Sequence, residues 1–102
     1  MKNEKSKERA IFKAFMKITG IEEQNLKAIE EFSELIRAIT KYMTSKSNDN
    51  YEHLLKEIVD AELMIGQIKY IVNQEPYLKI LKEKKMLELT KFIEDVQADI
   101  QS

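Results

Sequence analysis

The stretch from Glu57 to Val72 constrains the fold most, because apolar side chains fall on nearly every side of it when it is wound as a helix. A helix that is apolar on most faces is usually buried. Glu57 and Asp60 nevertheless lie in this stretch, about 60° apart around the axis, on the side that carries Met64 and Ile68. A buried carboxylate is strongly destabilising unless it is paired, protonated or bound to a metal. These two acids therefore need partners.

Composition narrows the class of protein. The chain has 102 residues, with 17 basic and 18 acidic side chains and a net charge of −1, which fits one domain and gives no general reason to expect nucleic acid or an anionic membrane as a partner. The lack of cysteine excludes disulfides and thiolate metal sites. No apolar run reaches the roughly 18 residues of a membrane span, and no signal-peptide core follows the charged N-terminus. We therefore expect a cytoplasmic protein.

Apolar periodicity and turn residues predict an all-α protein. Residues 1–9 are mostly charged and are expected to fray, and residues 10–102 form one helical domain. We expect a short helix over residues 10–18 ended by Gly20, and a long one over about 22–43. The polar loop 44–50 should supply an Asn or Asp as the cap of the central helix, which runs to about residue 73. Pro76 suits the first turn of the last helix, about 76–100. The predicted architecture is a bundle of three long helices plus the short one.

The central helix needs cover on most of its faces. The helix over 22–43 offers one apolar stripe, formed by Ala28, Ile29, Phe32, Leu35, Ile36, Ile39, Tyr42 and Met43. Together the two other long helices can cover only part of the central one. The remainder predicts a symmetric partner subunit, so we expect a homo-oligomer, either a dimer or a tetramer.

A second cluster of acids, Glu30 to Glu34, lies on the preceding helix. Glu31 and Glu34 have the same i, i+3 spacing as Glu57 and Asp60, and two antiparallel helices joined by a short loop would bring the pairs to matching depth. Four carboxylates this close require a cation or strongly raised pKa values. Ligands that are all oxygen suit a hard ion, Mg²⁺ or Mn²⁺.

A simpler interpretation applies to part of this pattern. Acid-rich helix faces are usually solvated, and Glu30 and Glu34 have cations one or two turns away with which they could pair. Those cations are Lys27, Arg37 and Lys41. Asp60 fits this interpretation less well, because Asp is a modest helix former with little reason to stand among Ile, Val and Met.

The two clusters together resemble a known signature. Glu30-Glu31-x-x-Glu34, a spacer of 22 residues (35–56) and Glu57-x-x-Asp60 are similar to the acid motif of the MazG-like all-α nucleoside triphosphate pyrophosphohydrolases. The resemblance covers about residues 10–93. Further segments resemble the small single-domain members found in phages and bacteria: Gly20-Ile21-Glu22 with Gln24, Glu34-Leu35-Ile36, and Lys85-Met86 with Leu89.

The resemblance implies the hydrolysis of a nucleoside triphosphate to the monophosphate and pyrophosphate. It implies that Glu31, Glu34, Glu57 and Asp60 hold Mg²⁺, and that Glu34 also orients the attacking water as general base. Glu30 matches the first acid of the motif, and we expect it to position the metal-ligating side chains without binding the metal itself.

The resemblance also suggests three contacts with the substrate. Lys85 lies where relatives often carry a lysine and is expected to contact phosphate, and Asn73 and Gln24 are expected to make polar contacts. Thr19 stands where many relatives have an aromatic residue, which weakens the case for base stacking there. We expect His53, the single histidine, to be a surface residue.

Two other functions compete with this hypothesis. In the first, the chain is a non-catalytic oligomeric helical interaction module whose acids form surface or intersubunit ion pairs. In the second, the basic segment 1–17 contacts nucleic acid, which the net charge of −1 opposes. Pyrophosphate release from a nucleotide panel would separate the enzyme from the interaction module.

Overall fold

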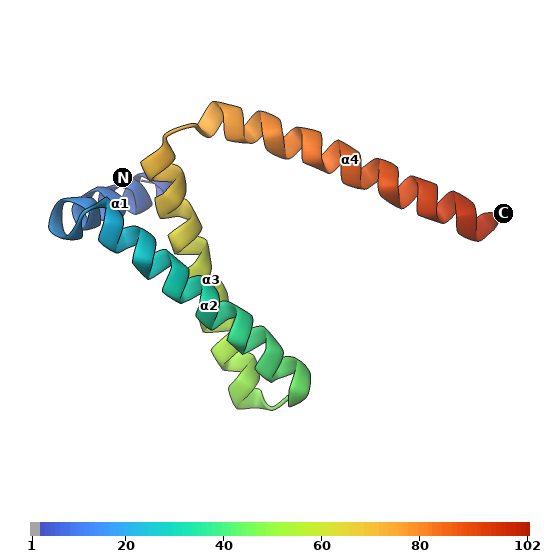
Figure 1. Ribbon diagram of the computed structural model, residues 1–102, viewed down its shortest axis with the longest axis horizontal. Coiled ribbons are helices and arrows are strands. Elements are labelled where there is room, and N and C mark those ends of the chain that lie inside the picture. Colours follow the sequence, from blue (N-terminus) through green and yellow to red (C-terminus); the bar gives the residue numbers. More distant parts are fainter. Residues whose placement is uncertain (1–2) are drawn as a thin grey trace. The chain divides into compact units, whose positions relative to one another are not determined.

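The computed structural model describes residues 3–102, and all of the secondary structure in that range is α-helical (Figure 1). The four helices are α1 (Glu4–Thr19), α2 (Ile21–Thr44), α3 (Asn48–Val72) and α4 (Glu75–Gln101). The all-α class is confirmed, and the last three helices begin and end within a few residues of their predicted bounds. The chain divides into two compact units. The first ends at Val72 and holds α1 to α3, and the second, Asn73–Ser102, holds α4, so a bundle that includes α4 stays a prediction.

The first helix is longer than its apolar pattern predicts. α1 begins at Glu4 rather than near Ala10, because Asn3 caps it: the Asn3 Oδ1 accepts a hydrogen bond from the backbone N–H of Ser6 at 2.8 Å. The charged residues that follow are good helix formers, and Glu4 favours the positive end of the helix dipole. Of the segment expected to fray, residues 1–2 lie outside the described residues, and Glu4–Arg9 is helical.

A single glycine separates α1 from α2. Gly20 has a φ of 90°, which side chains other than glycine rarely adopt, and its N–H donates to the Met16 carbonyl at 3.0 Å. The predicted role of Gly20 as the residue that ends the first helix is confirmed. Because α2 starts at the next residue, this turn fixes the direction in which α2 leaves α1.

The short loop between α2 and α3 makes these helices an antiparallel hairpin (Figure 1). Ser47 is the cap, since its Oγ accepts from the Asn50 backbone N–H at 3.1 Å. The prediction that an Asn or Asp would cap this helix is wrong, because α3 already begins at Asn48. Asn50 instead donates from Nδ2 to the Ser45 carbonyl at 2.7 Å, beyond the end of α2. Loop side chains thus bond both helix ends.

Small residues line the interior of the first unit. Ala28 and Ala38 of α2 and Ala61 of α3 are buried, which allows the two backbones to pack closely. Phe12 of α1 is buried against Gly66, where an added Cβ would lie only 2.9 Å from the Phe12 Cζ. By contrast, the α2 stripe expected from the sequence is only partly covered in one chain. Several of its members are exposed: Ile29, Ile36, Ile39 and Met43.

The second unit is built on α4, which has Pro76 in its first turn as predicted. Between residues 75 and 101, none of the side chains of α4 is buried, and large apolar ones such as Phe92 and Leu87 are exposed. Over residues 3–102, the helices are all too short or too polar to cross a membrane.

Candidate metal site in the α2–α3 hairpin

The α2–α3 hairpin brings acids from two helices together. Glu31 of α2 and Glu57 and Asp60 of α3 each offer a carboxylate oxygen, and these oxygens lie within 4.8 Å of one another. Glu30, Glu31 and Glu34 form a second group of three within the same limit. Glu31 belongs to both groups. The four acids assigned as ligands from the sequence therefore lie in two overlapping groups, and their metal-binding role stays a prediction.

Burial separates these acids into two kinds. Glu31 and Glu57 are each only 7% exposed, whereas Glu30 and Asp60 are exposed and Glu34 is half-buried. Among the described residues, the Oε2 atoms of Glu31 and Glu57 are buried and have no hydrogen-bond partner. A buried acceptor without a partner is unfavourable by about 1–3 kcal/mol. This pair of atoms is the strongest sign that the hairpin accommodates a ligand.

The closeness of these acids affects the pKa of Glu57. The pKa of Glu57 is raised from its ordinary value of 4.5, first by burial and then by the negative charges of Glu34, Asp60 and Glu31, while His53 acts in the opposite direction. Glu34 is the strongest of the neighbouring carboxylates, so it acts on Glu57 across the two helices. The cluster therefore favours either a proton or a cation.

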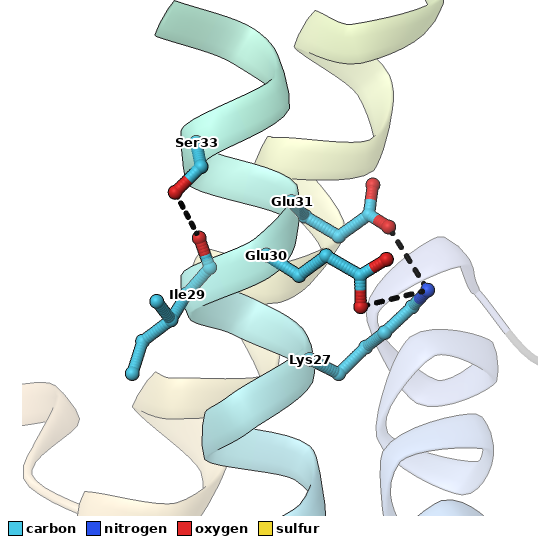
Figure 2. A network of polar contacts seen from close by, with 5 residues as sticks. All are labelled: Lys27, Ile29, Glu30, Glu31 and Ser33. Atoms are coloured by element: carbon cyan, nitrogen blue, oxygen red, sulfur yellow. Dashed lines mark hydrogen bonds and ion pairs between the residues drawn. The ribbon is translucent and has the colours of Figure 1, made fainter.

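Lys27 partly neutralises the α2 side of the site (Figure 2). Its Nζ lies 3.1 Å from the Glu31 Oε1 and 3.8 Å from the Glu30 Oε2. The hydrogen bond to Glu31 is the main reason that the pKa of Lys27 is raised. The predicted pairing of Lys27 with Glu30 or Glu34 omits Glu31, although the i, i+4 spacing of Lys27 and Glu31 indicates that pair as well.

His53, which was expected to be a surface residue without a role in the site, also lies near the acids. Its Nε2 lies 3.9 Å from the Glu57 Oε1, one helical turn away, and its side chain is half-exposed. The expectation of a surface residue thus describes its exposure but omits this contact. The i, i+4 spacing of His53 and Glu57 would have indicated the contact.

The chemistry of these donors fits a hard divalent cation. Lys27 and His53 each approach one oxygen of their acid, Oε1, and leave the Oε2 of Glu31 and of Glu57 without a partner among the described residues. Oxygen ligands on opposite sides of one Mg²⁺ or Ca²⁺ are about 4–5 Å apart, which matches carboxylate oxygens that lie within 4.8 Å. The residues present therefore fit Mg²⁺ or Mn²⁺.

The residues expected to contact substrate have other surroundings. Gln24 is buried, and its Nε2 donates to the Thr19 Oγ1 at 2.6 Å, where it braces the turn between α1 and α2. Asn73 follows α3 and has a positive φ of 52°. The exposed Lys85 lies 3.8 Å from Glu88 on α4. Contact of any of the three with substrate stays a prediction.

Comparisons with family models, with curated proteins and with solved structures found no match to this chain. The class that the fold and site define is therefore an all-α protein with a cluster of buried and exposed acids in a helical hairpin.

Proposed function

We propose that this chain is a metal-dependent nucleoside triphosphate pyrophosphohydrolase, similar to the MazG-like enzymes, that acts in the cytoplasm. The observation that carries this proposal is that Glu31 and Glu57, two members of one group of acids, each have a buried oxygen without a hydrogen-bond partner among the described residues. A solvated, purely structural acid face would have no reason to bury such atoms.

In the proposed reaction, Glu31, Glu34, Glu57 and Asp60 hold Mg²⁺ or Mn²⁺. The ion, when bound, supplies charge neutralisation for the phosphate oxygens. Glu34 is half-buried at the edge of the cluster, where it orients a water and accepts its proton. The water oxygen forms a bond to the α-phosphorus, and the bond to the bridging oxygen breaks as pyrophosphate leaves.

The other residues have supporting roles in this proposal. Lys27 lies close to both Glu30 and Glu31, and in this proposal Lys27 holds the Glu31 side chain in place while Glu30 holds Lys27. Lys85 is proposed to contact phosphate, and Asn73 and Gln24 to make polar contacts with the nucleotide.

Metal binding and turnover test the proposal separately. Calorimetry with Mn²⁺ should show binding to the wild-type chain and a loss of at least about tenfold in affinity for Glu57→Gln and Asp60→Asn. Pyrophosphate release from a panel of canonical and modified nucleotides should require Mg²⁺ and fall by about 100-fold or more in both variants. Glu52→Gln changes an exposed glutamate of the same helix and should leave both measurements unchanged. Silence across the panel together with the absence of metal binding would overturn the proposal.

A second candidate function is a non-catalytic helical interaction module. The observation that favours it is the exposure of large apolar side chains on the hairpin, such as Ile36 at 66% and Met43 at 72%, since exposed apolar patches often mark protein contacts. We propose that these side chains serve homo-oligomer formation in either function. An oligomer that binds no metal and hydrolyses no nucleotide would favour the interaction module.

A further inference from the structure

Helix α4 has an apolar stripe that the structure leaves exposed. α4 is one continuous helix of 27 residues (orange to red in Figure 1). At 100° per residue, six of its large apolar side chains fall within an arc of about 120°. They are Leu78, Leu81, Leu89, Phe92, Ile93 and Val96. All but Leu78 are exposed, and Leu78 is only half-buried. A helix gains most of its stability from packing such a stripe, so α4 needs a partner.

The charges of α4 indicate which partner it takes. Residues 75–87 contain four lysines and two glutamates, whereas residues 88–101 contain four acids and one lysine. The helix therefore has a basic first half and an acidic second half. Two copies that run antiparallel would place each basic half against an acidic half, whereas a parallel pair would oppose like charges along its whole length.

Side chains at the stripe itself carry the same asymmetry. Lys85 falls within the stripe, and Lys84, Asp95 and Asp99 all flank it on the same side. Asp99 lies at the edge of the arc, and Asp95 and Lys84 lie about 40° and 60° beyond that edge. Around a two-fold axis near residue 90, residues on one border of a helix meet the same border of the other copy. Lys84 would then lie beside Asp95 of a second copy. The ion pairs that these residues make within α4, such as Lys91 with Asp95 at 3.9 Å, are exposed and weak, so they do not oppose this exchange.

From these observations we propose that α4 is a dimerisation helix that pairs antiparallel with α4 of a second copy of this chain. The apolar stripe supplies the contact and the charge reversal along the helix sets its direction. This inference goes beyond the proposed enzymatic activity. It replaces one part of that proposal, because a Lys85 within the paired stripe would not be available to contact phosphate.

Charge reversal tests the pairing in the 102-residue chain. Sedimentation equilibrium should show a wild-type dimer. Lys84→Glu with Lys85→Glu should weaken it by about tenfold or more, as should Asp95→Lys with Asp99→Lys. The variant that carries all four changes, or a mixture of the two double variants, should recover the dimer. Lys5→Glu with Lys13→Glu makes the same charge change at exposed lysines of α1 and should have no effect. A monomeric wild-type chain, or a dimer that is insensitive to both double variants, would overturn the proposal.

Cysteine crosslinking tests the direction, and the chain offers a clean background because it contains no cysteine. In an antiparallel pair, position 84 lies beside position 95 of the other copy and about 16 Å from its own equivalent. A mixture of Lys84→Cys and Asp95→Cys chains should therefore form a disulfide between the two, and neither should crosslink efficiently to itself. Efficient crosslinking of Lys84→Cys to itself would indicate a parallel pair and contradict the proposal. So would the lack of a crosslink in the mixture.

Discussion

Acids of the α2–α3 hairpin and acids of α4 have the same chemistry but opposite environments. Glu57 is only 7% exposed and has an oxygen without a partner among the described residues. Asp95 on α4 has a side chain that is 66% exposed and lies beside Lys91, one turn away. In the hairpin, two helices bring acids together, whereas in α4 each acid is solvated along a single helix. Helix pairing, rather than the spacing of acids along one helix, therefore creates the candidate site.

The largest expected difference between the two regions is in the stability lost when an apolar side chain is removed. Phe12→Ala removes a buried ring from the first unit and should lower the free energy of unfolding by about 3 kcal/mol. Leu87 is 72% exposed and lies on the side of α4 opposite its apolar stripe. Leu87→Ala should therefore change the free energy of unfolding by less than about 0.5 kcal/mol. Urea denaturation followed by circular dichroism measures both values. Similar losses for the two variants would contradict the contrast between a packed unit and an uncovered helix.

A somewhat smaller difference is expected where a side chain is added. Gly66→Leu would place a Cβ 2.9 Å from the buried Phe12 ring and should destabilise the chain by about 2 kcal/mol. Ala98→Leu adds the same bulk at an exposed position of α4 and should change the free energy of unfolding by less than about 0.5 kcal/mol. Thermal unfolding gives the comparison. If Gly66→Leu were as stable as Ala98→Leu, the close contact of α1 with α3 would be wrong.

Sequence reasoning predicted the helices well because their signals are local. Gly20 and Pro76 mark helix boundaries through backbone geometry alone. The approach of Glu31 to Glu57 was also predictable, because one short loop joins the two helices and fixes their relative depth. Asn3 and Ser47 were missed as caps, since several neighbouring polar residues can serve and only the actual backbone path selects one.

Burial was harder to predict than secondary structure. The stripe of α2 contains large apolar residues, yet in one chain Ala28 and Ala38 are buried while Ile29 and Ile36 are exposed. Helical periodicity identifies an apolar face but does not say which helix covers it. For the same reason, the apolar pattern of α4 does not determine which helix covers it. The charge distribution of α4 adds the information on which the proposed antiparallel pairing depends.

Protonation of Glu57 should change the free energy of unfolding by about 1 kcal/mol. Protonation of an exposed acid of α4 should change it little. Its pKa is raised above 4.5 by burial and neighbouring acids, so the folded chain binds the proton more tightly than the unfolded chain does. Without metal, the ionised Glu57 therefore destabilises the fold at pH 7, and Glu57→Gln should be more stable than wild type. As the pH falls through the raised pKa toward 4.5, the wild-type chain gains stability and the difference should shrink.

Urea denaturation at a series of pH values without divalent metal measures this difference. Glu88→Gln, at an exposed acid of α4, is the matched control and should show little effect at any of these pH values. A Glu57→Gln variant that is less stable than wild type at pH 7 would show that the buried carboxylate is already compensated in the metal-free chain.

The smallest expected difference separates two lysine–acid pairs with the same i, i+4 spacing. Lys27 pairs at 3.1 Å with Glu31, whose side chain is 9% exposed, whereas Lys91 pairs at 3.9 Å with the exposed Asp95. Attraction is stronger where water is partly excluded, but the half-exposed Lys27 limits the gain. Double-mutant cycles that combine Lys→Met with Glu31→Gln or Asp95→Asn should give a coupling free energy of about 0.5 kcal/mol for the first pair and about 0.2 kcal/mol for the second. At 1 M salt the second coupling should vanish while part of the first remains, since salt screens exposed charges most effectively. Equal couplings with equal salt dependence would mean that Glu31 is as well solvated as Asp95, and the electrostatic distinction between the hairpin and α4 would then be lost.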